Sequence, residues 1–121
     1  METTNSVFNM SLYQYVTTET VLYWIRNIVA NRMASTGKAW VDIFSMYNSG
    51  TYELDYFASK SLSYSYNNQW MVIDYKLFTP GQPLQPGTLW VAEQIPGFVI
   101  RADQTPTLSS TRFWSSYNIS L

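Results

Sequence analysis

The sequence predicts an α+β fold in which two helices are followed by antiparallel strands. Residues 18–34 carry apolar side chains at spacings of three and four, as a helix with one buried face requires. Residues 70–78 follow a period of two, in which alternate side chains point to opposite faces as in a strand. Two further short apolar segments are bounded by turn-forming residues. A chain of 121 residues has room for one domain, or part of one, with a modest core.

The first helix is predicted over about residues 18–34. Thr17 or Thr18 can cap its first turn, and Gly37 marks its end. Arg26 falls on the side opposite the apolar residues, which favours exposure to solvent. The residues predicted to share the buried face are Leu22, Ile25, Val29 and Met33.

A second helix is predicted after Gly37. It ends before Asn48-Ser49-Gly50, whose residue types favour a turn. Its predicted buried face consists of Trp40, Ile43, Phe44 and Tyr47. Three tryptophans lie on apolar-patterned segments and are predicted to belong to the core, namely Trp24, Trp40 and Trp70.

The first strand after the helices is predicted over Asn68 to Phe78. Asp74 and Lys76 fall on its other face, which is the pattern of a solvated edge. The three prolines and two glycines of residues 79–87 predict a loop. Leu89–Glu93 and Phe98–Ala102 then read as two more strands. The predicted buried face of the first strand comprises Met71, Ile73, Tyr75 and Leu77.

Composition excludes several classes of function. The chain has no cysteine and no histidine, so a Ser-His-Asp triad, a disulfide and a zinc site built on those residues are excluded. Its net charge of −1 without a basic stripe argues against nucleic-acid binding. No apolar run reaches about 18 residues, so no membrane span is expected. The start lacks the features of a signal peptide. Neither a metal nor a cofactor is predicted.

Two short segments read as halves of one motif. Joined directly, Asn48-Ser49-Gly50-Thr51-Tyr52 and Asn67-Asn68-Gln69-Trp70 give NSGTYNNQW. Together with further segments along the chain, this motif resembles the phospholipase B-like proteins. Residues 53–66 depart from the family pattern and are interpreted as an insert, for which a retained short intron is one explanation that transcript reads would test. The further segments are Glu2-Thr3-Thr4-Asn5, Trp24-Ile25-Arg26-Asn27, Val29-Ala30-Asn31-Arg32, Glu93-Gln94-Ile95-Pro96-Gly97 and Trp114-Ser115-Ser116-Tyr117-Asn118.

The resemblance implies that residues 1–121 are part of an N-terminal-nucleophile hydrolase, whose fold is an αββα sandwich. The implied activity is hydrolysis of acyl ester or amide bonds, with phospholipids as the substrate class. The implied nucleophile is a cysteine upstream of the aligned region, and this chain contains none. We therefore expect a fragment that is inactive alone and needs the remainder of the hydrolase chain. The resemblance also implies a secreted or lysosomal protein.

Asn67 and Asn68 are the candidate catalytic residues. Side-chain amides can donate to the oxyanion that forms during acyl transfer, and the alternative is that both asparagines hold backbone groups in a turn. For Asn48 and Thr51 the turn interpretation is favoured. Glu93 could orient backbone amides or could be an ordinary carboxylate at a strand end.

Two other functions stay open from the sequence. One is a non-catalytic module that binds lipid or glycan through exposed aromatic side chains. The other is a non-functional product of a disrupted gene. Asn9-Met10-Ser11 and Asn118-Ile119-Ser120 are formal glycosylation acceptor sites, which fit a secretory family.

Overall fold

The structure is a computed structural model that describes residues 2–6, 9–50 and 66–117. Within these residues four strands form one sheet in the order β1-β2-β3-β4, and each neighbouring pair is antiparallel. The strands are β1 Glu2–Ser6, β2 Tyr66–Ile73, β3 Leu89–Ile95 and β4 Phe98–Asp103. The predicted α+β class with antiparallel strands is confirmed.

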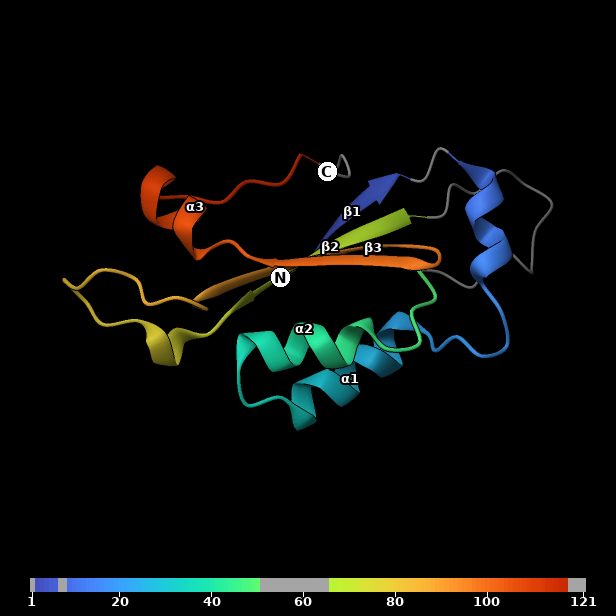
Figure 1. The fold of residues 1–121 in the computed structure, drawn as a ribbon, viewed down its shortest axis with the longest axis horizontal. Helices are drawn as coiled ribbons and strands as arrows, with labels where there is room; N and C mark the ends of the chain where they lie inside the picture. Colours follow the sequence, from blue (N-terminus) through green and yellow to red (C-terminus); the bar gives the residue numbers. More distant parts are fainter. Residues whose placement is uncertain (1, 7–8, 51–65, 118–121) are drawn as a thin grey trace.

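Helices lie on both sides of this sheet (Figure 1). The pair α1 and α2 covers one face, and α3 lies on the opposite side, near the end of the sheet from which the long loop extends. Two short 3₁₀ helices, η1 and η2, complete the described elements. The bounds are η1 Met10–Tyr15, α1 Tyr23–Met33, α2 Gly37–Ser45, η2 Tyr75–Leu77 and α3 Thr105–Thr111.

The core lies between α2 and the sheet. The Phe44 ring is fully buried and packs 4.8 Å from both the Trp40 and the Trp70 ring centroids. Large aromatic rings remove much apolar surface from water, so the contact of these three rings forms the centre of a small core. The buried members of the cluster are Ala30, Trp40, Val41, Phe44, Trp70 and Ala92.

The second helix forms nearly as predicted. Trp40 and Phe44 lie on its buried face, and the helix ends before Asn48. Gly37 is its first residue and not a break, because the Thr36 hydroxyl caps it by accepting from the Ala39 amide at 3.1 Å. Tyr47 was predicted to be buried but is 69% exposed, because the chain leaves the helix and takes φ 54° there.

The buried face of α1 was predicted wrongly. The helix begins at Tyr23 and buries Arg26 and Ala30, which lie four residues apart. The small side chain of Ala30, fully buried, lets this face approach Trp40 and the sheet closely. The opposite face is apolar but turned to water, with Trp24 49% exposed, so its prediction as a core residue is also wrong. Four other apolar residues of α1 are exposed as well, namely Ile25, Ile28, Val29 and Met33.

The strand β2 is shorter than predicted and faces the other way. It ends at Ile73, and Asp74 then caps η2 by accepting from the Lys76 amide. The helix pair packs on the side of Trp70 and Val72, so Ile73 is left 54% exposed. Asp74 itself is buried, because its amide donates to the Thr88 carbonyl at 2.9 Å and fixes it against β3.

The strands β3 and β4 and the loop of residues 79–87 form as predicted. Asp103 joins the loop to the sheet, since its carboxylate accepts from the Gly87 amide at 2.8 Å and the Thr105 amide at 2.9 Å. The predicted insert lies outside the described residues except for Tyr66, where β2 begins. In the described part of the chain no helix is long and apolar enough to cross a membrane.

The Asp103 carboxylate predicts a loss of stability in acid. Burial alone would raise the pKa of Asp103, but the hydrogen bonds from Thr105 and Gly87 outweigh it and lower the pKa from 3.8. A carboxylate whose pKa is lower in the folded than in the unfolded state stabilises the fold when the pH is above its unfolded-state pKa. This stabilisation is lost as the pH falls through the folded-state pKa. We expect the urea concentration at the unfolding midpoint to decrease as the pH is lowered below about 4. Asp103→Asn should make this midpoint depend less on pH. An unchanged pH profile in the variant would contradict this role.

Candidate functional site

A buried polar group lies where β2 begins and β3 ends, on the face covered by the helices. Asn68 of β2 and Gln94 of β3 are opposite each other in register, and both are 0% exposed. Residues directly opposite in an antiparallel pair point to the same side and lie close together. Arg26 reaches Gln94 from α1, with its Nη2 donating to Gln94 Oε1 at 2.7 Å. We call Arg26, Asn68 and Gln94 the amide cluster.

Arg26 is a buried cation held without a carboxylate in the described part of the chain. Its Nε donates to the Val21 carbonyl at 2.8 Å, and Nη1 donates to the carbonyl of Phe44. The guanidinium also lies 4.4 Å from the Phe44 ring centroid. Burial lowers the pKa of Arg26 to about 10, which still leaves it charged at neutral pH. The three acceptors fix the guanidinium in one position.

Arg26 determines which way the Gln94 amide faces. A guanidinium can only donate, so the oxygen of Gln94 must face it and the nitrogen must face away. The Nε2 of Gln94 is buried and has no hydrogen-bond partner among the described residues. Such an unmet donor costs about 1–3 kcal/mol. The fold therefore keeps a buried amide donor beside Asn68 at a cost in stability.

The two halves of the NSGTYNNQW motif meet at this end of the sheet. Asn48 Nδ2 donates to the carbonyls of Ile95 at 2.8 Å and Phe98 at 3.0 Å. Its Oδ1 accepts from the Gly50 amide at 2.8 Å, which closes a tight turn. The turn interpretation of Asn48 is confirmed, whereas Thr51 lies outside the described residues. Residues 48–50 thus lie against the β3–β4 turn, directly after Gln94.

Comparison with known proteins agrees with this arrangement of motifs. The family model described as Phospholipase B matches residues 1–120. The chain belongs to the phospholipase B family. It is 48% identical to phospholipase B-like protein F of Dictyostelium discoideum over 118 residues, and 48% identical to protein G of the same organism over 124. It is also 48% identical over 122 residues to the human protein named putative phospholipase B-like 2.

These relatives are much longer than this phospholipase B family chain. In each of the three alignments 98% of this chain is covered, but only 18% of the relative. The chain therefore spans less than one fifth of their length. The resemblance read from the motifs is confirmed as a family assignment.

The other predicted residues of this family member are placed as follows. The backbone of Asn67 pairs with Asn5 of β1. Asn9 is exposed and accepts from the Ser11 amide at 3.1 Å, while Asn118 lies outside the described residues. The catalytic role of Asn67 and Asn68 and the modification of Asn9 and Asn118 stay predictions. No group of three or more side chains suited to a metal ion occurs in the part of the chain that is described.

Glu93 belongs to a second polar group, on the opposite face of the sheet. Its Oε1 accepts from Gln69 Nε2 at 2.6 Å, and Gln69 Oε1 accepts from Trp114 Nε1 at 3.1 Å. Gln69 pairs with Glu93 in register, so alternation places both away from the amide cluster. Glu93 was predicted either to orient backbone amides or to be an ordinary carboxylate at a strand end. The structure shows a different contact, in which Glu93 accepts from a side chain of the neighbouring strand β2.

Sequence reasoning missed Arg26 and Gln94. Arg26 was placed on the exposed side of α1 because it falls opposite the apolar residues in the helical spacing, and charged residues are almost never fully buried without a partner. The spacing of Arg26, Ala30 and Ala34 carried a signal, since small residues four apart mark a face that can approach the core. Gln94 lies within an apolar strand, and a polar residue there signals a satisfied or functional group.

Proposed function

We propose that this chain supplies part of the catalytic machinery of a phospholipase B-like hydrolase. In the proposal it contributes amide donors, the remainder of the hydrolase chain contributes the nucleophile, and the chain alone is inactive. The substrates are acyl ester or amide bonds, with phospholipids as the class. The observation that carries it is the amide cluster, where Asn68 of the family motif lies fully buried beside the Gln94 amide.

The chemistry follows from what amides can do in acyl transfer. As a nucleophile attacks an acyl carbonyl, negative charge develops on the oxygen, and fixed N–H donors about 2.7–3.1 Å from it lower the barrier. A rigid donor is needed, because a displacement of about 1 Å can reduce the rate about a hundredfold. Arg26 and the sheet register supply that rigidity for Gln94 and Asn68.

The nucleophile has to come from elsewhere. The chain has no cysteine, and an N-terminal nucleophile uses its own amine as base, so it needs no histidine. The proposed architecture is the αββα sandwich, in which this sheet and its helix pair form one half. The proposed protein follows the secretory route to the outside or to the lysosome, with Asn9 and Asn118 as acceptor sites for glycans.

The test is a set of three proteins assayed for fatty-acid release from phospholipid vesicles. The first is this chain alone. The second is full-length phospholipase B-like protein F with its matching segment replaced by this chain, and the third is the same chimera with residues 53–66 deleted. We expect no turnover from the first and turnover from the third, with the second lower because the insert separates the two half-motifs.

Two results would overturn the proposal. One is turnover by the chain alone that a serine or threonine substitution within it abolishes, since that would place the nucleophile here. The other is a folded third protein without turnover, provided that unaltered protein F is active in the same assay. Circular dichroism and gel filtration establish that each chimera is folded.

A further inference from the structure

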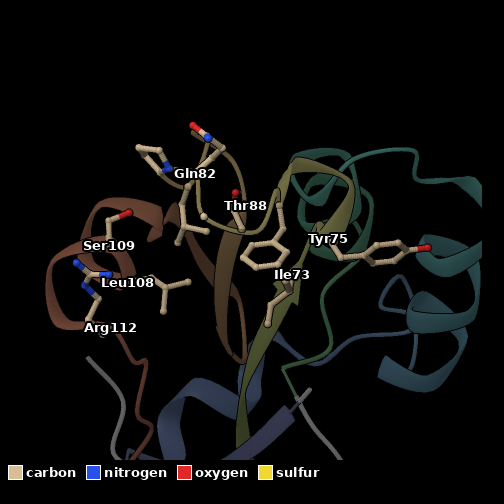
Figure 2. Close-up of a pocket in the computed structure, with 11 residues that line it drawn as sticks. Ile73, Tyr75, Gln82, Thr88, Leu108, Ser109 and Arg112 are labelled. Atoms are coloured by element: carbon tan, nitrogen blue, oxygen red, sulfur yellow. The ribbon is translucent and has the colours of Figure 1, made fainter.

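A groove of about 820 Å³ lies at the other end of the sheet from the amide cluster. Figure 2 shows its walls, which come from the end of β2, the segment after η2, the loop of residues 79–87 and α3. Ile73 and Asn68 are five residues apart on β2, so at roughly 3.3 Å per residue the two sites are separated by about 16 Å. The groove is therefore distinct from the proposed catalytic site.

The walls of the groove are mainly apolar, with Gln82, Thr88, Ser109 and Arg112 as the polar or charged members. Ile73 and Phe78 line it while each stays 54% exposed, which leaves large apolar surfaces in water. Leu84 of the loop and Leu108 of α3 line it as well, and Figure 2 shows the Leu108 side chain directed into the space facing Ile73. A volume within the roughly 300–1,000 Å³ of ligand sites and such a lining suit a hydrocarbon chain.

Hydrogen bonds from backbone amides hold part of the walls in place. The Asp74 amide donates to the Thr88 carbonyl at 2.9 Å, and the Gly87 amide donates to the Asp103 carboxylate at 2.8 Å, so the end of the loop that leads into β3 is tied to the sheet. Leu89 donates to Thr105 Oγ1 at 3.0 Å, which fixes the start of α3. A groove that is formed before binding loses less conformational entropy when it is filled.

The groove carries one positive charge and no negative charge among its lining residues. That charge is Arg112, which follows α3 in a left-handed conformation at φ 70°. Its guanidinium has no acidic partner in the described part of the chain and lies on the α3 side with Ser109 (Figure 2). An arginine at the rim of an apolar groove complements an anionic group, and a carboxylate can accept two of its N–H bonds.

We propose that this groove binds a fatty-acid carboxylate. Its hydrocarbon chain lies against Ile73, Phe78 and Leu108, and its carboxylate accepts from Arg112. The hydrocarbon chain is required and the charge adds to its affinity, because the Arg112 site is open to water and an ion pair there is weak alone. Binding at this groove does not depend on the amide cluster or on any turnover.

In the experiment the full chain is titrated with dodecanoate at concentrations below those at which dodecanoate forms micelles. Calorimetry measures the heat of binding during the titration. We expect saturable binding of one dodecanoate per chain. Dodecanol, which lacks the charge, should bind about tenfold more weakly, the difference expected for one charge-assisted contact. Butyrate, which lacks the long chain, should show no binding under the same conditions.

The variants separate this site from binding elsewhere on the chain. Arg112→Gly removes the cation and suits the backbone, because glycine adopts φ 70° without strain. It should weaken dodecanoate about tenfold and leave dodecanol unchanged, while Arg112→Lys should stay within about threefold of the parent. Leu108→Asp should weaken both ligands. The matched control is Arg32→Gly, which removes an exposed cation from the last turn of α1.

The proposal is overturned if dodecanoate shows no saturable binding to the folded chain. It is also overturned if Arg112→Gly binds dodecanoate within twofold of the parent, or if Arg32→Gly loses affinity equally, since either result would place the anion elsewhere. If Arg112→Gly lowers the thermal midpoint, titration is repeated well below that midpoint, where the same tenfold loss is expected.

Discussion

Replacing Gly50 with alanine should lower the free energy of unfolding by about 2–5 kcal/mol, the sum of a left-handed conformation and a steric overlap. Gly50 has φ 64°, and an added Cβ would lie 2.1 Å from the Pro96 nitrogen and 2.3 Å from the Ile95 carbonyl carbon. Both atoms belong to the backbone, so no side chain can move aside. The turn of residues 48–50 would have to leave the β3–β4 turn.

The matched control is Gly81→Ala. Gly81 has φ 76°, but an added Cβ would have nothing within 4 Å, so only the backbone term of roughly 1–2 kcal/mol applies. Urea unfolding of both variants measures the difference. Equal losses would show that residues 48–50 do not pack against Pro96 as described.

Replacing Arg26 with methionine should lower the free energy of unfolding by about 3–5 kcal/mol, because three buried acceptors lose their donor at a cost of about 1–3 kcal/mol each, part of which is offset by no longer burying a charge. Methionine keeps the length and the packing of the side chain. The carbonyls of Val21 and Phe44 and the Gln94 oxygen would all lose a donor at once. Leaving buried acceptors unmet outweighs the relief of no longer burying a charge.

Arg32→Met is the control for this variant. Arg32 lies on the same helix, in its exposed last turn, where single substitutions usually change stability by less than about 0.5 kcal/mol. The measurement is the denaturant midpoint of each protein. A loss below about 1 kcal/mol in Arg26→Met would mean that Arg26 does not organise the helix pair and the sheet.

The order and type of α1, α2, β2, β3 and β4 could be predicted from sequence because local patterns dominate there. The strand β1, the helix α3 and the two 3₁₀ helices were not predicted. The prolines and glycines of residues 79–87 mark the boundary between β2 and β3 in the sequence itself, whereas the cap of α2 at Thr36 was identified only in the structure. The buried faces of α1 and β2 could not be predicted, because both segments are apolar on two sides. Which side packs depends on partners elsewhere in the chain, here Trp40 and Phe44.

Only one residue of the amide cluster, Asn68, was predicted from the sequence. The motif pointed to Asn68, since its residues resemble those of a family. Gln94 becomes part of the site only through the strand register that places it opposite Asn68, and Arg26 through the α1 face that was assigned wrongly. Contacts between residues 26, 68 and 94 are set by the tertiary fold, and the only periodic signal for them is the four-residue spacing of Arg26, Ala30 and Ala34, which marks the buried face of α1 without naming its partners.

The most direct test of the proposed function changes the candidate donors in the chimera without residues 53–66. Asn67→Ala and Asn68→Ala are assayed for fatty-acid release, beside Asn31→Ala, which removes an amide outside the amide cluster that accepts from Trp40 Nε1 at 2.7 Å. If one of the pair is an oxyanion donor, its kcat should fall by about 10²–10³ with KM nearly unchanged. Asn31→Ala should lower the thermal midpoint and leave kcat within about threefold. If both donor variants keep the parental kcat while their thermal midpoints fall, Asn67 and Asn68 are structural and the proposed catalytic role is wrong.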